Sequence, residues 1–118
     1  MDTTTQPVID LSYLDMMADG DAFMRQTMLE MLLEEMPPEI EKLRAAFLAQ
    51  DAEELRQVAH KMKSTLAFVG NPAMTEANAA LELIGKEGTD IPRAATHLEV
   101  MEATFKTVFP ALQAEVAG

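Results

Sequence analysis

The fold is decided by residues 51–72, which read DAEELRQVAHKMKSTLAFVGNP. Asp51 followed by Glu54 resembles a capping box, in which an N-cap carboxylate accepts a hydrogen bond from the third helical residue. Gly70 fits the left-handed position that follows many helices. Asn71-Pro72 is typical of a cap and first residue of the next helix. We therefore expect two helices joined by a very short connection, which favours antiparallel neighbours.

The sequence before residue 51 predicts a short helix and a long one. The short helix runs from Ser12, as its N-cap, to about Met17, and Asp21 caps the long helix. Pro37-Pro38 interrupts the long segment, but apolar residues recur every three or four positions on both sides, so we expect one kinked helix. Its apolar positions, with the methionines expected to fill the core, are Phe23, Met24, Met28, Met31, Leu32, Met36, Ile40, Leu43, Phe47 and Leu48.

The sequence after residue 72 predicts two more helices. The first is expected to end at Gly85, and the last to start at Asp90-Pro92 and bend at Pro110. The predicted fold is all-α: an up-down antiparallel four-helix bundle with a short extra N-terminal helix. The bundle is assigned to residues 8–118, and residues 1–7 are expected to form a flexible lead.

Composition narrows the classes of function. The 118 residues include 9 Lys/Arg and 20 Asp/Glu, so the net charge is −11. This acidity opposes general binding to nucleic acid or anionic membranes. The absence of Cys excludes disulfides, thiolate metal sites and a Cys nucleophile. With no signal peptide and no apolar run near the ~20 residues of a membrane span, we expect a cytoplasmic protein. We also expect a monomer, because the acidic exterior offers no clear apolar patch.

His60 does not fit the core face of its predicted helix. At about 100° per residue, Met62 and Leu66 fall on the side of the helix opposite His60, whereas Lys63 and Ser64 fall within about 60° of it. The imidazole should therefore project into solvent. A solvent-facing His on a helix is most often a plain polar surface residue, so the position alone does not establish a function.

The charge pattern around His60 adds a second signal. No acidic residue occurs from Leu55 to Thr75, and this window carries Arg56, Lys61 and Lys63, a charge of +3. The rest of the chain carries a charge of −14, which gives the net charge of −11. Imidazole is substantially unprotonated and nucleophilic at neutral pH. The window could accept a transferred anionic group on the ring, with Lys63 holding its oxygens. An anion-binding or partner-binding surface without chemistry would explain it equally well.

Residues 59–70, AHKMKSTLAFVG, resemble the signature of histidine-containing phosphotransfer (HPt) domains. That pattern is an active His, a Lys three positions on, a small residue after the Lys, and a Gly seven beyond the Lys. His60, Lys63, Ser64 and Gly70 fill these places, and the resemblance extends over roughly residues 8–116. Two departures occur: Met62 stands where the family often has Leu, and Ser64 where it often has Gly.

The resemblance implies a phosphorelay carrier without autonomous catalytic activity. His60 would accept a phosphoryl group at Nε2 from a receiver-domain aspartate, or by a kinase route, and pass it to another receiver. Lys63 would stabilise the phosphate. The implied partners are response-regulator receiver domains and a hybrid sensor histidine kinase, and the receiver would supply Mg²⁺, so that this chain needs no metal or other cofactor. The implied partner-docking residues are Arg56, Lys61, Ser64, Ala67, Phe68 and Gly70.

Two other functions stay open. A degenerate HPt domain could act as a non-catalytic helical adaptor that docks an acidic partner on the Arg56–Lys63 surface. A metal- or methionine-dependent binder, for example of Cu(I), is the second alternative. His97 is expected to have a structural or surface role. The phosphoacceptor assignment would be contradicted if the nucleophilic ring nitrogen were buried or bonded to a neighbouring carboxylate.

Overall fold

The computed structural model describes residues 8–118, so the lead predicted for residues 1–7 lies outside the described residues. The described chain is helical and contains no strand. No helix within residues 8–118 is long and apolar enough to cross a membrane. The elements are α1 (Ser12–Ala18), α2 (Ala22–Leu48), α3 (Ala52–Val69), α4 (Pro72–Glu87), the 3₁₀ turn η1 (Ile91–Arg93) and α5 (Ala94–Ala117).

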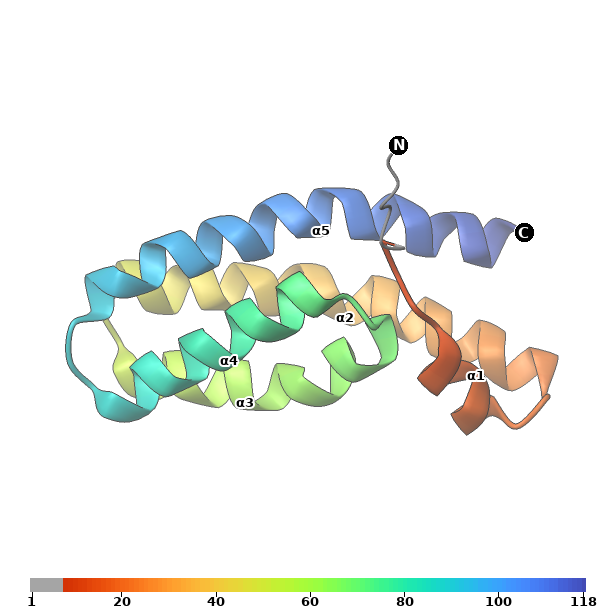
Figure 1. Ribbon diagram of the computed structural model, residues 1–118, viewed down its shortest axis with the longest axis horizontal. Coiled ribbons are helices and arrows are strands. Elements are labelled where there is room, and N and C mark those ends of the chain that lie inside the picture. Colours follow the sequence, from red (N-terminus) through yellow and green to blue (C-terminus); the bar gives the residue numbers. More distant parts are fainter. Residues whose placement is uncertain (1–7) are drawn as a thin grey trace.

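Four long helices form the bundle that the sequence predicts. Helices α2, α3, α4 and α5 pack in a ring, in which each runs antiparallel to the next and α5 closes against α2 (Figure 1). The shorter α3–α4 hairpin covers only part of α2 and α5, which extend beyond it (Figure 1). The short helix α1 packs against α2 and α3 at the end of the bundle where α2 extends beyond the hairpin. This arrangement confirms the all-α bundle with an extra N-terminal helix.

Side-chain caps place the starts of the long helices. Asp21 and Asp51 each accept a hydrogen bond at 3.0 Å from the backbone N–H three residues on, and Asn71 does the same for α4. These caps confirm the sequence prediction. The predicted cap of α1 is wrong: Ser12 is its first helical residue, and the Asp10 carboxylate accepts from the Ser12 N–H at 3.0 Å and hydroxyl at 2.6 Å.

Helix α2 continues through Pro37 and Pro38 as one helix, as predicted. The predicted core stripe is wrong at its last residue, Leu48, which is 69% exposed. It is also wrong in its first half, where Phe23, Met24 and Met31 are 81%, 46% and 50% exposed. The physical reason is that the α3–α4 hairpin does not extend along this part of α2 (Figure 1).

The end of α4 and the start of α5 also differ from the prediction. Helix α4 passes Gly85 and ends before Gly88, whose φ of 73° is left-handed. At Gly85 a Cβ atom would lie 2.6 Å from the Arg56 backbone nitrogen, so this glycine permits close packing of α3 and α4. Asp90 is itself left-handed and provides no side-chain cap; η1 intervenes before α5, which runs on through Pro110.

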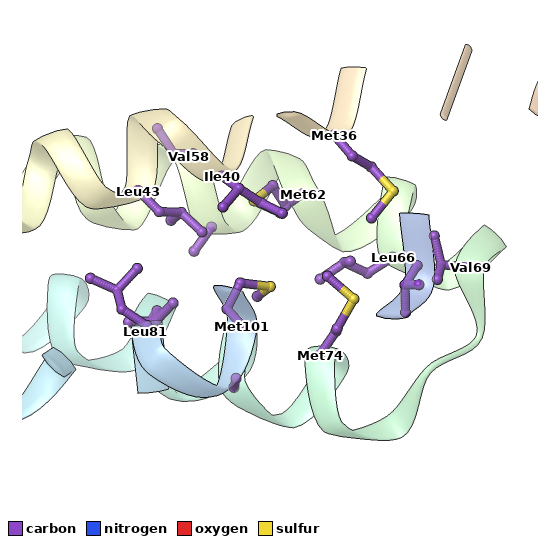
Figure 2. Packing of buried hydrophobic residues seen from close by; sticks show 14 of the residues in the cluster. Met36, Ile40, Leu43, Val58, Met62, Leu66, Val69, Met74, Leu81 and Met101 are labelled. Atoms are coloured by element: carbon purple, nitrogen blue, oxygen red, sulfur yellow. The ribbon is translucent and has the colours of Figure 1, made fainter. Parts of the chain in front are cut away.

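The core lies between the four long helices. Buried methionines and branched aliphatic side chains from α2, α3, α4 and α5 meet along the bundle axis (Figure 2). These contacts bury one face of α3 and leave the opposite face exposed to solvent. The residues labelled there are Met36, Ile40, Leu43, Val58, Met62, Leu66, Val69, Met74, Leu81 and Met101.

Glu39 of α2 is a buried carboxyl, only 7% exposed, and its Oε1 has no hydrogen-bond partner. Burial, with repulsion from Glu35, raises the pKa of Glu39 above its ordinary value. A raised folded-state pKa favours the protonated form, so stability falls as pH rises through that pKa. We expect Glu39→Gln to be more stable than wild type at pH 8 by about 1 kcal/mol, because the neutral amide has no buried charge.

The measurement is urea unfolding of both proteins from pH 4.5 to pH 8. The stability difference between variant and wild type should grow with pH, since only the wild type ionises at this position. A stability difference that does not change with pH would show that ionisation of Glu39 does not destabilise the fold.

Candidate functional site

His60 projects from the middle of α3 into solvent, as the helical geometry predicts. Its side chain is 63% exposed. Met62 and Leu66, on the opposite face of the same helix, are buried at 0% and 2% exposure. The ring therefore contributes little to the core and is open to a partner.

Glu82 of α4 reaches across to this ring. Its Oε2 lies 2.8 Å from His60 Nδ1, and its Oε1 lies 3.2 Å from Lys63 Nζ. The hydrogen bond from His60, and after it the Lys63 contact, hold the pKa of Glu82 below its ordinary value, against the opposing effect of desolvation. The stretch without acidic residues from Leu55 to Thr75 therefore does not correspond to acid-free surroundings in the fold, because the facing helix α4 supplies a carboxylate.

The carboxylate contacts Nδ1, whereas the nitrogen predicted to react is Nε2. Within residues 8–118 no hydrogen bond to Nε2 is formed. A neutral imidazole carries one N–H and one lone pair, and the tautomer follows from the hydrogen bond. With Nδ1–H donating to Glu82, the lone pair is on Nε2, directed away from Glu82. The contact thus orients the ring and does not block its reactive nitrogen.

Two of the predicted docking cations lie away from the Glu82–His60 pair. Arg56 donates to Glu53 through Nε at 3.1 Å and Nη2 at 2.6 Å, and this pairing lowers the pKa of Glu53 to about 2. Lys61 lies on another side of α3, beside Glu39 and Lys42 of α2. Of the three cations in the basic window, the structure brings Lys63 to the Glu82–His60 pair.

The other predicted docking residues divide into two groups. Ser64 and Ala67 are exposed on α3, one and two turns beyond His60. Phe68 is half-buried and stacks on Tyr13 of α1, with ring centroids 5.1 Å apart. Gly70 is held inside the fold: it is left-handed at φ 70°, and a Cβ there would lie 2.2 Å from the Asp10 carbonyl oxygen.

A groove of about 410 Å³ lies beside Ser64, between α1, α2 and α3. We call it the methionine groove, because four methionines line it. The prediction that the methionines at helical spacing fill the core is wrong for Met24 and Met31, which are exposed in this groove. The expected absence of an apolar surface patch is wrong for the same reason. The lining residues are Met17, Met24, Met28, Met31, Leu32, Glu35, Ser64, Thr65 and Phe68.

Sequence reasoning missed Glu82, although a signal for it exists. In an antiparallel pair of helices, residues equally distant from the turn face one another. His60 and Glu82 each lie 11 positions from Asn71, the cap between α3 and α4. Counting outward from that turn would have paired them.

No cluster that could hold a metal ion occurs among the described residues: no three His, Asp or Glu side chains converge there. His97 is half-buried on α5. The described part of the chain therefore presents His60, Glu82 and Lys63 as its one assembled candidate site for chemistry, with the methionine groove beside it.

A four-helix bundle that displays one histidine on its outer face, beside a lysine, is the arrangement that the sequence resemblance to histidine-containing phosphotransfer domains leads us to expect. The Hpt domain family model matches residues 27–116, so the chain belongs to the Hpt domain family. Among solved structures it is similar to histidine-containing phosphotransfer protein B (HptB) from Pseudomonas aeruginosa PAO1. The two share 24% identity and a TM-score of 0.84 over 96% of this chain and 97% of that one, which shows the common fold. No match is found among curated proteins.

Proposed function

We propose that His60 carries the phosphoryl group in a phosphorelay, accepting it from a receiver-domain aspartate or by a kinase route and passing it to a second receiver. Membership of the Hpt domain family supports a role in phosphotransfer. The observation that carries the assignment to His60 is its geometry: the side chain is 63% exposed, Nδ1 contacts Glu82 at 2.8 Å, and no hydrogen bond to Nε2 is formed within residues 8–118.

The transfer step follows from this tautomer. The Nε2 lone pair attacks phosphorus, the bond from phosphorus to the aspartyl oxygen breaks, and the aspartate leaves as a carboxylate. The proton stays on Nδ1, so the phosphorylated ring is formally an imidazolium. Glu82 stabilises this charge, because its carboxylate already accepts the Nδ1–H. The return transfer reverses the same bonds.

Lys63 is proposed to stabilise the transferred group. Its ammonium is 55% exposed and 3.2 Å from Glu82 Oε1, and it lies on the face of α3 that carries His60. It can therefore contact a phosphoryl oxygen while partly neutralising Glu82, whose charge would otherwise repel the phosphate.

We expect Lys63→Ala to slow phosphotransfer to His60 by about tenfold without abolishing it, since the nucleophile remains. The initial rate of labelling from a phosphorylated receiver measures this effect. Lys86→Ala, an exposed lysine in the last turn of α4, is the matched control. An unchanged rate in the Lys63 variant would remove this residue from the mechanism.

Glu82 is proposed as a positioning residue. We expect Glu82→Ala to slow transfer by about tenfold and to release the single Nδ1–H tautomer, because no acceptor remains at Nδ1. Glu82→Gln retains an acceptor oxygen, so its transfer rate should lie between the rates of Glu82→Ala and wild type. The ¹⁵N chemical shifts of the His60 ring report the tautomer independently of activity.

Glu76→Ala is the matched control, an exposed glutamate on the same helix outside the site. If the His60 tautomer in Glu82→Ala equals that of wild type, the proposed positioning role fails.

The proposed docking surface consists of Ser64, Ala67 and the methionine groove. Ser64 lies one turn from His60 and also lines the groove. A receiver domain that brings its phosphoaspartate to Nε2 therefore covers Ser64 and extends over this apolar hollow. Phe68 contributes from the groove wall, whereas Arg56 and Lys61 would act mainly by attracting the acidic partner. Mg²⁺ would come with the receiver.

The direct test uses a panel of purified receiver domains, each phosphorylated on aspartate with acetyl phosphate. At least one should transfer label to the wild-type chain within minutes. Binding of a receiver without label transfer would instead favour the non-catalytic adaptor. Labelling with phosphoramidate, a small phosphodonor, tests the reactivity of His60 without a partner.

A further inference from the structure

We propose that the methionines of the groove are a reversible oxidation site, and that their conversion to sulfoxides blocks docking of a receiver domain while leaving the chemistry of His60 intact. The inference rests on the proposed function, because it requires that the receiver dock over this groove. It adds a modification site and a form of regulation to that function.

The methionines of the described chain fall into two groups. Met16, Met17, Met24 and Met31 are 64%, 52%, 46% and 50% exposed, and Met28 is half-buried beside them. The remaining four are fully buried in the bundle core: Met36, Met62, Met74 and Met101. Because the chain has no Cys, methionine sulfur is its most readily oxidised side-chain group, and four of the described methionines are exposed on α1 and the first part of α2.

The groove depends on these thioethers for its apolar character. Four of its nine lining residues are methionines, and Leu32 and Phe68 add further apolar surface. A sulfoxide is polar and hydrogen-bonds to water, so burying it under a partner without a new hydrogen bond is costly. Oxidation at several positions converts an apolar docking surface into a hydrated one.

The chemical step needs a two-electron oxidant of the peroxide class. The sulfur lone pair attacks one oxygen of hydrogen peroxide, the O–O bond breaks, and an S–O bond forms. The second oxygen leaves as water after proton transfer; sulfur is oxidised and peroxide is reduced. Methionine sulfoxide reductases reverse the change with electrons from thiols, one enzyme for each sulfoxide epimer.

The phosphoacceptor group contains no sulfur. Glu82 contacts both His60 and Lys63 on the α3–α4 face, and the nearest methionine in sequence, Met62, is fully buried on the other side of α3. Oxidation in the groove should therefore separate two activities, transfer from a receiver and labelling by a small phosphodonor.

The experiment treats the folded protein with hydrogen peroxide and maps sulfoxides by peptide mass spectrometry. We expect oxidation at Met17, Met24 and Met31, with the buried methionines spared. Transfer from the best phosphorylated receiver of the panel should slow by at least tenfold, while phosphoramidate labelling of His60 is unchanged. Treatment with both reductases should restore the rate.

A variant with Leu at positions 17, 24, 28 and 31 is the matched control, since Leu is apolar and of similar volume but does not oxidise. This variant, Met17→Leu with Met24→Leu, Met28→Leu and Met31→Leu, is compared only with its own untreated form, and peroxide should leave its rate of receiver transfer unchanged relative to that form. An equal loss in this variant, an unchanged rate in fully oxidised wild type, or oxidation of the buried methionines would overturn the inference and leave the proposed function standing. Failure of every receiver to label untreated protein would overturn both.

Discussion

His60→Gln is expected to abolish labelling of the chain by phosphorylated receivers, at least a thousandfold below wild type. Gln offers no nucleophilic ring nitrogen, and a phosphoryl group needs one to form a covalent intermediate. The fold should remain, because the His60 side chain is 63% exposed and its partner Glu82 can accept a hydrogen bond from the Gln amide. Circular dichroism and urea unfolding should be near wild type.

The matched control is His97→Gln, which removes the other histidine of the chain, on α5. It should be labelled at the wild-type rate. The label on wild type should be labile in acid and stable in alkali, as expected of a phosphoramidate; an alkali-sensitive label would indicate an acyl phosphate. Label retained in the His60 variant would refute the phosphoacceptor assignment.

Gly70→Ala is expected to lower the free energy of unfolding by about 3 kcal/mol. Part of the loss, about 1–2 kcal/mol, is the cost of a left-handed φ for a residue with a Cβ. The rest comes from overpacking: the new Cβ would lie 2.2 Å from the Asp10 carbonyl oxygen and 2.9 Å from the Asp10 Cβ. The chain before α1 would have to move away from its place on Gly70.

Gly88→Ala separates these two causes. Gly88 has nearly the same φ, 73°, and follows a helix in the same way, but its Cβ would meet nothing within 4 Å. We expect a loss of about 1 kcal/mol there, measured by urea unfolding under the same conditions. Equal losses in the two variants would show that the contact with Asp10 carries no strain.

The contact at Gly70 also has a consequence for the groove. The Asp10 N–H donates to the Val69 carbonyl at 3.0 Å, and the Asn71 side-chain amide donates to the Val8 carbonyl at 2.8 Å. These bonds tie the segment before α1 to the end of α3. Since α1 contributes Met17 to the groove and Tyr13 to the stack on Phe68, Gly70 supports the proposed docking surface from within the fold.

Much of the fold was predictable because its signals are local. Asp21, Asp51 and Asn71 each cap a helix through a backbone group three residues away, and Gly70 ends α3 through its own φ. Predictions failed where a distant element decided the outcome. Gly85 resembles a helix end, but it lies within α4, where α3 passes too close for any side chain.

In the candidate site, too, the features set by local sequence were predictable and those set by a neighbouring helix were not. The outward direction of His60 follows from the 3.6-residue period of one helix and was predictable. Glu82 was not predicted, since its place beside His60 depends on how α4 aligns with α3. The methionine groove was missed because the helical period alone cannot show how far a neighbouring helix extends along α2.

The amino-acid sequence by itself determined which segments are helical, where most of them start, and that His60 stands with Lys63 on the solvent side of α3. The tertiary structure alone decided which nitrogen of that ring is held, which cations are already paired, and that several methionines line an open surface. The physical reason is range: caps, glycine conformations and helical periodicity act within a few residues, whereas pairing and burial depend on the alignment and length of helices brought together by the fold.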